Sequence, residues 1–247
     1  MDETLSPETA RARLRHVKIL SVVDTPSLDA LAQRLTWRRV RLGEEVVSHL
    51  DRGTQVFFAI EGTFNAKLQT AFGRQVAIRQ LLPGSHFGEI AALTETPRSL
   101  RIVAETDGLI AECPTDAFLD LMGKNGAFAT AVAAHLARNV VALTDRVFEL
   151  AALEMRFRVY AELLRLASTG EHVERGILIR QAPTHEAIAA TVGAQREAVN
   201  RELRALANNG VIQQARREIL ILNLEWLRDE LRRRAGATTS DAVDWRL

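Results

Sequence analysis

The chain has 247 residues, of which 47% are hydrophobic and 26% charged, and its formal net charge at pH 7 is +1. This length and composition predict one large domain or two ordinary ones, each with a hydrophobic core. The single cysteine, Cys113, excludes a disulfide framework and an iron–sulfur cluster held by four cysteines of one chain.

Residues 1–36 are predicted to form a helical lead. The Ser6-Pro7-Glu8 sequence is typical of a helix start, and residues 24–27 separate a first helix from a second. This part lacks the apolar run of a signal peptide, and nothing in the chain approaches the roughly 18 uninterrupted apolar residues of a membrane span. We therefore expect a soluble, cytoplasmic protein that does not bind membranes.

Residues 37–120 contain short apolar or alternating runs separated by glycine turns. Strands at a spacing of about ten residues predict an antiparallel barrel or sandwich. The predicted strands are residues 56–60, 64–68, 75–82, 99–105 and 109–112.

The most specific motif is residues 87–99, Phe-Gly-Glu-Ile-Ala-Ala-Leu-Thr-Glu-Thr-Pro-Arg-Ser. Glu89 can accept a hydrogen bond from a ribose hydroxyl, and Arg98 can donate a planar fork to phosphodiester oxygens. Ser99 can add a donor, and Gly88 allows the backbone to approach a ligand closely. The pattern therefore indicates a site for a cyclic phosphate. The structural alternative is a glycine turn with a solvated glutamate and a surface arginine.

Residues 121–154 are predicted to form a long helix that pairs with a second copy of the chain. Apolar residues recur in steps of three and four, which is the seam of a coiled coil. The alternative is one helix packed on its own domain. The seam consists of Ala133, Leu136, Val140, Leu143, Val147 and Leu150.

Residues 155–228 are predicted to form a winged helix-turn-helix, followed by a tail at residues 229–247. Residues 155–247 together carry three more Lys and Arg than Asp and Glu, which suits nucleic acid, whereas residues 1–154 carry two fewer. Helix, glycine turn, helix and hairpin follow one another in the required order. The helices are residues 157–167, 185–192 and 196–208, a strand covers residues 177–179, and the hairpin strands are residues 211–214 and 219–222.

The predicted recognition helix has an apolar stripe of Val199, Leu203 and Leu206 and a polar face at its N-terminal end. Arginine can pair with guanine, glutamate can accept from cytosine, and helix N-termini suit phosphates. The structural alternative is a solvated helix face, but the order of the elements favours DNA. The candidate DNA-binding residues are Thr184, His185, Gln195, Arg196, Glu197, Asn200, Arg201 and Arg217.

Over roughly residues 15–230 the chain resembles the cyclic-AMP receptor protein family, the CRP/FNR regulators. Phe87-Gly88-Glu89-Ile90 and Pro97-Arg98-Ser99 match the family's nucleotide cassette, and Arg196, Glu197 and Arg201 match its recognition helix. The resemblance implies an α+β fold with a cyclic-nucleotide-binding β-roll (jelly-roll), a long dimerisation helix and a C-terminal winged helix-turn-helix.

The resemblance also implies a role for each cassette residue. Glu89 would bind the ribose hydroxyl, and Arg98 and Ser99 would bind the cyclic phosphate. The implied nucleotide-binding set is Gly88, Glu89, Ile90, Ala91, Arg98, Ser99, Asn139, Leu143 and Thr144.

Four positions depart from the family's pattern. The adjacent Thr and Ser that contact adenine across the dimer fall on Leu143 and Thr144, and a family Arg one turn earlier falls on Asn139. Leu100 stands where Ala is usual. We therefore expect cyclic AMP as the allosteric ligand, with cyclic GMP as the second candidate.

These observations predict a homodimeric, nucleotide-gated transcription regulator that binds a palindromic TGTGA-like site, with RNA polymerase as a partner by resemblance. We expect that the protein is not an enzyme and binds no metal or cofactor. The sequence shows no nucleophile–base pair, no metal-ligand spacing and no phosphate-binding loop. One alternative is a regulator of the same fold that needs no nucleotide or responds to cyclic di-GMP or a haem-bound gas, with His49 and His86 as possible haem ligands. The other is a nucleotide-binding module that acts on a protein instead of DNA.

Overall fold

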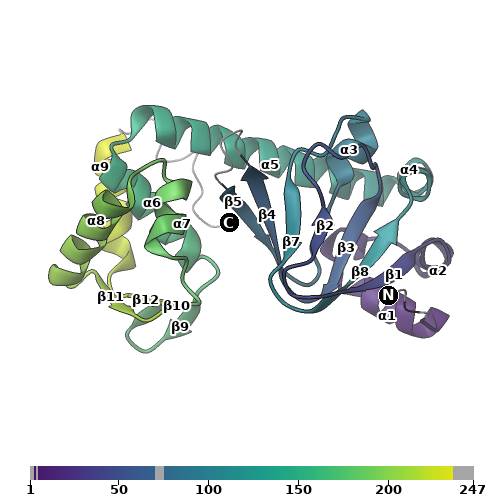
Figure 1. Cartoon of the computed structure of the whole chain (residues 1–247), viewed down its shortest axis with the longest axis horizontal. Coiled ribbons are helices and arrows are strands. Elements are labelled where there is room, and N and C mark those ends of the chain that lie inside the picture. The colour runs from purple at the N-terminus through teal and green to yellow at the C-terminus, as the bar shows by residue number, and fades with distance from the viewer. Residues whose placement is uncertain (1–2, 4, 70–74, 236–247) are drawn as a thin grey trace. The chain divides into compact units, whose positions relative to one another are not determined.

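The computed structural model describes residue 3, residues 5–69 and residues 75–235. They form two compact units that divide between Arg138 and Asn139 (Figure 1). The β-roll, the long helix and the helix-turn-helix expected from the sequence are confirmed. The predicted turn at Phe72-Gly73 and residues 236–247 of the predicted tail lie outside the described residues.

The first unit opens with α1 (Pro7–Arg15), η1 (Lys18–Leu20) and α2 (Thr25–Ala32). Ser6 caps α1 by accepting a hydrogen bond from the amide of Thr9 at 3.2 Å. Asp24 caps α2 by accepting from the amide of Ser27 at 2.9 Å. Both helices therefore begin where a side-chain oxygen satisfies an otherwise unpaired backbone donor.

The described strands of this unit form two antiparallel four-stranded sheets. The first has the order β1 (Thr36–Val40), β8 (Gly108–Cys113), β3 (Val56–Glu61) and β6 (His86–Phe87). The second has the order β2 (Glu45–Val47), β7 (Arg101–Ala104), β4 (Phe64–Gln69) and β5 (Gln75–Leu81).

Strand β3 is buried on both faces, which explains its unbroken apolar sequence. Phe57 and Ala59 belong to a core to which both sheets contribute. Val56 and Phe58 belong to a second core with residues of the helices. Because side chains alternate across a strand, four successive apolar residues supply both cores.

Three further helices lie between or after these strands in the sequence. Helix α3 (Glu89–Thr94) directly follows β6, and α4 (Thr115–Lys124) follows β8. Helix α5 (Gly126–Ala152) is the predicted long helix, and its residues are shared between the two units. Among the described helices, α5 is the one with the length and apolar composition to cross a membrane. A helix that pairs with a second copy has the same two properties.

The second unit is the winged helix-turn-helix. Its sheet has the order β11-β12-β10-β9, and its core contains Val199, Leu203 and Leu206 of the predicted apolar stripe. Its elements are α6 (Met155–Ala167), β9 (Glu171–Val173), β10 (Gly176–Arg180), α7 (His185–Thr191), α8 (Arg196–Asn208), β11 (Ile212–Ala215), β12 (Glu218–Ile221) and α9 (Leu224–Ala235).

The end of this unit differs from the prediction. A tail is expected from residue 229, but α9 continues to Ala235. Leu227 is fully buried and Leu231 is 2% exposed, so the helix packs on the core through one face. The spacing of Leu224, Leu227 and Leu231 is that of an amphipathic helix and accounts for the difference.

Candidate nucleotide-binding and DNA-binding sites

Gly88 holds the start of the cassette in a conformation that suits glycine. Its φ is +94°, and it forms the N-terminal cap of α3. A Cβ at this position would lie 2.6 Å from Nη1 of Arg98 and 2.7 Å from the carbonyl oxygen of Gln55. The absence of a side chain therefore allows Arg98 to lie against the backbone.

Arg98 is nearly buried, with 4% of its surface exposed. Its Nη1 donates to the carbonyl of Gly88 at 3.1 Å, and its Nη2 donates to the carbonyl of Gln55 at 2.6 Å. The guanidinium carbon lies 5.4 Å from the centre of the Phe57 ring. These contacts fix the fork of donors in one orientation.

The charge of Arg98 is not neutralised by a direct partner. Among the described residues it forms no ion pair, and its buried Nε has no hydrogen-bond partner. Burial lowers the pKa of Arg98, and the carboxylates of Asp51 and Glu89 act in the opposite direction. A buried cation with an unused donor is costly unless an anion completes it. The site is therefore suited to an anionic ligand.

Glu89 is the first residue of α3 and is 4% exposed. One carboxylate oxygen lies 3.6 Å from Nε2 of His135 on α5. Burial raises the pKa of Glu89, but the adjacent imidazoles of His135 and His86 help to outweigh burial, so the pKa lies below its ordinary value. Glu89 is therefore ionised at neutral pH and can accept a hydrogen bond from a hydroxyl group.

The other predicted cassette residues differ in exposure. Ala91 is 4% exposed, whereas Ile90 is 47% exposed and Ser99 is also exposed. Ala91 therefore packs inside the unit, and the hydroxyl of Ser99 is accessible from solvent. The structure brings Gly88 and Arg98 into direct contact.

The predicted base-sensing residues lie on the part of α5 that belongs to the second unit. Leu143 is 62% exposed, and the hydroxyl of Thr144 donates to the carbonyl of Val140 at 3.0 Å. Asn139 is half-buried. Their roles in nucleotide recognition stay predictions.

His86 is a buried residue whose surroundings the sequence did not predict. It is 6% exposed, and its ring centre lies 4.3 Å from that of His135. Burial lowers the pKa of His86 to about 4, although the carboxylate of Glu89 acts in the opposite direction, so its imidazole is neutral at pH 7. The sequence suggested His86 only as a possible haem ligand. Its contact with residues of α3 and α5 depends on the fold.

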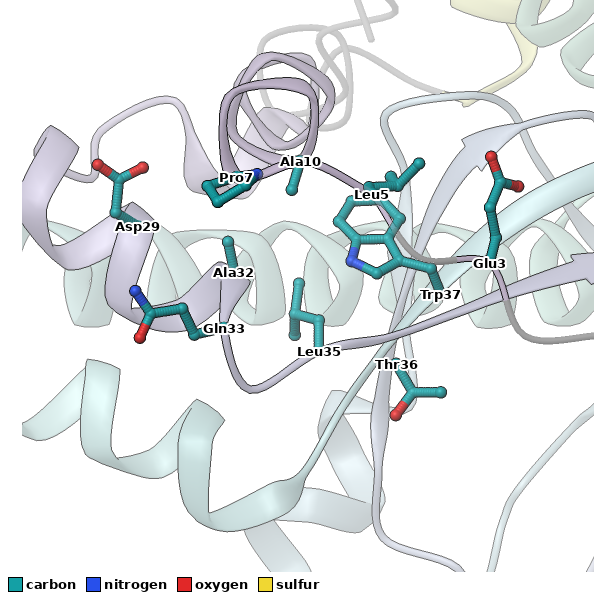
Figure 2. A pocket seen from close by; sticks show the side chains of 10 residues that line it. All are labelled: Glu3, Leu5, Pro7, Ala10, Asp29, Ala32, Gln33, Leu35, Thr36 and Trp37. Carbon is teal, nitrogen blue, oxygen red and sulfur yellow. The ribbon is translucent and has the colours of Figure 1, made fainter.

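A cavity of about 380 Å³ lies between the N-terminal helices and the start of β1. Figure 2 shows the ring of Trp37 on one side and Ala32 and Gln33 of the α2 region on another. None of the cassette residues lines this cavity. It is therefore separate from the candidate nucleotide site.

The predicted pairing seam of α5 is exposed over most of its length. Val140, Leu143, Val147 and Leu150 are 62%, 62%, 66% and 50% exposed. Leu136 instead packs partly against the core of the first unit. Unpartnered large apolar side chains in a row are unusual on a monomer surface and indicate an interface.

The N-terminal end of α8 presents unpaired charges. Arg196, Glu197 and Arg201 are exposed and form no ion pair or side-chain hydrogen bond among the described residues. Gln195, at the cap of α8, is also exposed and makes no side-chain cap. The opposite side of α8 is buried in the core, so these polar groups face solvent and remain available to a ligand.

Three further candidate DNA-binding residues are engaged or partly buried within the unit, which the sequence did not indicate: Thr184, His185 and Asn200. The hydroxyl of Thr184 accepts from the amide of Ala187 at 3.1 Å and caps α7. Nε2 of His185 lies 3.1 Å from Oε1 of Gln214 on β11, which links α7 to the wing. Asn200 is half-buried. Contacts of these three residues with DNA stay predictions.

The tip of the wing is the two-residue turn Arg216-Arg217 between β11 and β12. Both arginines are exposed, and Arg217 has a φ of +60°. The carbonyl of Arg217 accepts from the amide of Ala182 at 2.8 Å, which ties the turn to the segment before α7. The backbone is thus fixed while both guanidinium groups remain in solvent.

A network of four charged residues joins the end of α5 to α6, and nothing in the local sequence pattern indicates it. Arg146 bonds Glu149 at 3.1 Å and Glu162 at 2.8 Å. Arg165 bonds Glu149 at 2.6 Å and also pairs with Glu162. Glu149 and Glu162 are 3% and 7% exposed. The two glutamates are therefore compensated by two cations, which makes this joint specific.

Comparison with known proteins identifies two domains along the chain. Residues 37–125 match the cyclic nucleotide-binding domain, and residues 157–230 match the Crp-like helix-turn-helix domain. The chain is 29% identical over 176 residues to the transcriptional regulator SdrP of Thermus thermophilus, covering 71% of this chain and 83% of SdrP.

Two further relatives cover a larger part of the chain. A CRP-like cAMP-activated global transcriptional regulator of Mycobacterium tuberculosis is 26% identical over 215 residues, covering 87% of this chain and 96% of that protein. The crystal structure of a CRP-family transcriptional regulator from Thermus thermophilus is similar with a TM-score of 0.63 and 25% identity, covering 82% of this chain and 99% of that one. All three of these relatives are named as transcriptional regulators.

Proposed function

Because the chain belongs to the CRP/FNR family of transcription regulators, we propose that it is a homodimer whose binding to a palindromic DNA site is gated by a cyclic nucleotide. The family membership gives it a cyclic nucleotide-binding domain and a DNA-binding helix-turn-helix domain. The proposal adds the ligand, the assembly and the DNA site.

The observation that carries the proposal is the state of Arg98. It is a buried cation with a free Nε donor and no anionic partner among the described residues. A cyclic phosphate supplies one delocalised negative charge and oxygens that accept from the guanidinium fork. Glu89 accepts from the ribose hydroxyl, and Ser99 adds an accessible hydroxyl to the phosphate end.

Cyclic AMP is the ligand we propose first. It is the activator in the name of the Mycobacterium tuberculosis relative. Cyclic GMP is the second candidate because Leu143, Thr144 and Asn139 occupy positions where the family pattern differs. The phosphate and ribose contacts are common to both nucleotides, so the base contacts must provide the discrimination.

DNA recognition is assigned to α8 and the wing. Arg196 and Glu197 contact base edges in the major groove, while Gln195, Arg201 and Arg217 contact the phosphate backbone or neighbouring bases. In a dimer, two such helices about 34 Å apart reach successive major grooves of one palindromic TGTGA-like site. RNA polymerase is the partner expected of a family member at a promoter, in the cytoplasm.

Gating requires the nucleotide to favour the DNA-competent arrangement of the dimer. A ligand shifts an equilibrium only through its different affinities for the two states. Residues Leu143 and Thr144 lie at and beside the pairing seam, so a base that contacts them changes how the two helices pair. The seam is therefore the element through which binding of the cyclic nucleotide and binding of DNA affect each other.

The function is tested by fluorescence anisotropy with a labelled palindromic TGTGA-type duplex and a scrambled duplex at one fixed salt concentration. We expect tight binding to the palindrome with cyclic AMP or cyclic GMP present, and weak binding without a nucleotide. Equal affinity for both duplexes would contradict sequence-specific binding. Tight binding that no cyclic mononucleotide changes would contradict gating and leave a constitutive or differently gated regulator, for which cyclic di-GMP and a haem absorption band are the next measurements.

The dimer is tested by sedimentation of Leu143→Glu beside Ala142→Glu. Leu143 lies on the seam, whereas Ala142 is an exposed neighbour off the seam. We expect Leu143→Glu to sediment as a monomer, because two buried carboxylates would face each other, and Ala142→Glu to remain a dimer. A dimeric Leu143→Glu variant would place the interface elsewhere.

A further inference from the structure

Three potential metal ligands meet beside the cassette in the first unit. They are His86 on β6, Glu89 at the start of α3 and His135 on α5. One ring nitrogen from each histidine and one carboxylate oxygen of Glu89 all lie within 4.8 Å of one another. The residues come from three elements, so the fold holds the cluster from three sides.

The distance between His135 and Glu89 matches ligand spacing better than a strong hydrogen bond. Nε2 of His135 lies 3.6 Å from the carboxylate oxygen of Glu89. A direct hydrogen bond would be about 2.9 Å long, whereas two donors at about 2.05 Å from a tetrahedral ion are about 3.4 Å apart. The Glu89–His135 pair is therefore close to ligand spacing, and the cluster, whose ligand atoms lie within 4.8 Å of one another, would contract around an ion.

His86 gives a second, independent indication of a ligand. It is 6% exposed, and its Nε2 has no hydrogen-bond partner among the described residues. A buried imidazole nitrogen without a partner is costly, and a bound ion or its water relieves that cost. The side chain of His135 is 19% exposed, so the cluster is accessible to solvent on that side.

We propose that His86, Glu89 and His135 bind one divalent transition-metal ion of the zinc type. Two imidazoles and one carboxylate are a common donor set for such ions, and they leave a coordination position for water or another ligand. The two imidazoles disfavour Ca²⁺ and Mg²⁺, which prefer oxygen donors. The site lies within one chain.

This site has a consequence for regulation that rests on the proposed function. Glu89 is both a metal donor and the proposed acceptor for the ribose hydroxyl, so one carboxylate would serve two ligands. Arg98 is not among the metal donors, so the phosphate end of the nucleotide site is unaffected. Metal and cyclic nucleotide therefore compete for Glu89, and the ion acts as a negative regulator.

The site is tested by calorimetric titration of the untagged, chelator-treated full chain with Zn²⁺. We expect one ion per chain, with an affinity at least about tenfold lower in His135→Gln and in His86→Gln. His135 is half-buried on a helix, so its variant keeps the site testable if replacement of buried His86 impairs folding. His16→Gln, an exposed histidine of the same unit, is the matched control and should bind like the original chain.

Absence of Zn²⁺ binding, or binding that His135→Gln leaves unchanged, would overturn the metal site. Cyclic AMP titrations with and without saturating Zn²⁺ test the competition, with zinc and nucleotide mixed alone as a blank. We expect nucleotide binding to be weaker by about tenfold or more with the ion present, because the charge-assisted contact at Glu89 is lost. Equal nucleotide affinity with the ion bound would overturn the competition.

The two proposals fail in different ways. Histidine-dependent Zn²⁺ binding without any nucleotide binding would support the metal site and contradict the nucleotide site. Nucleotide binding without Zn²⁺ binding would support the nucleotide site and overturn the metal site.

Discussion

The cassette and the recognition helix both use arginine, but the side chain is buried in the cassette and exposed on the helix. Arg98 is 4% exposed and held by two backbone carbonyls, whereas Arg196 and Arg201 are exposed and unpaired among the described residues. A buried, oriented guanidinium suits one small anion of fixed shape. Hydrated, mobile guanidinium groups suit the repeated phosphates and base edges of DNA, and their contribution depends strongly on salt.

The difference shows how one residue type provides two kinds of recognition. The guanidinium of Arg98 loses its hydration when the protein folds. Ligand binding therefore gains a strong charge-assisted contact without that cost. On α8, desolvation occurs only when DNA binds. We therefore expect replacements in the cassette to affect folding or ligand affinity strongly, and replacements on α8 to affect DNA binding while the fold is retained.

The largest effect is expected for Arg98→Leu. Loss of the buried guanidinium removes the proposed phosphate partner, so the affinity for cyclic AMP should fall at least about 100-fold, or about 2.7 kcal/mol. Leucine is apolar and suits this buried position, so we expect the fold to persist. Calorimetry measures the affinity, and circular dichroism checks folding. Unchanged affinity in a folded variant would remove Arg98 from the site.

The next largest effect is expected for Gly88→Ala, which should lower the stability of the fold. The new Cβ would meet the carbonyl oxygen of Gln55 and Nη1 of Arg98 at a φ of +94°, so the first unit should lose about 1–3 kcal/mol of stability. Gly126→Ala is the control, since nothing lies within 4 Å of a Cβ there. Chemical denaturation measures the free energy of unfolding of both variants. Equal stability of the two variants would mean that the backbone at Gly88 relaxes without cost.

Arg196→Ala should lower discrimination between the palindromic and scrambled duplexes by roughly 1–3 kcal/mol, because a base contact is lost. The thermal stability should not change, since Arg196 is exposed and unpaired among the described residues. Arg204→Ala, an exposed arginine farther along α8, is the control. Equal losses of affinity on both duplexes would show that Arg196 contacts phosphate instead of bases.

The smallest effect is expected for Arg217→Gly. The left-handed backbone at Arg217 favours glycine, so stability should stay the same or increase slightly while one cation is lost. The slope of log affinity against log salt should fall by about 1, equally on both duplexes. An unchanged slope would remove Arg217 from the DNA contacts.

The sequence predicted the parts of the molecule that depend on neighbouring residues. The cassette is contiguous, the stripe of Val199, Leu203 and Leu206 has helical spacing, and the two domains follow in a recognisable order. Helix spacing also covers Leu227 and Leu231, but the polar residues around them concealed α9.

Features that depend on contacts between residues distant in the sequence could not be predicted from it. Glu89 and His135 are 46 residues apart and meet because α5 packs beside α3 and β6. The charge network of Glu149 and Glu162 requires α6 to turn back onto α5. The burial of Arg98 and the exposure of Ile90 likewise follow from the position of the cassette at the edge of a folded sheet, which local spacing does not encode.

The central claim is that the nucleotide site and the DNA site are coupled. Calorimetric titration of the full chain with cyclic AMP, alone and with saturating palindromic duplex at the same salt concentration, tests it most directly. Linkage requires the duplex to tighten nucleotide binding by the same factor by which the nucleotide tightens DNA binding. We predict a tightening of about 5- to 150-fold, the usual range of such coupling. The same nucleotide affinity with and without the duplex would contradict the account.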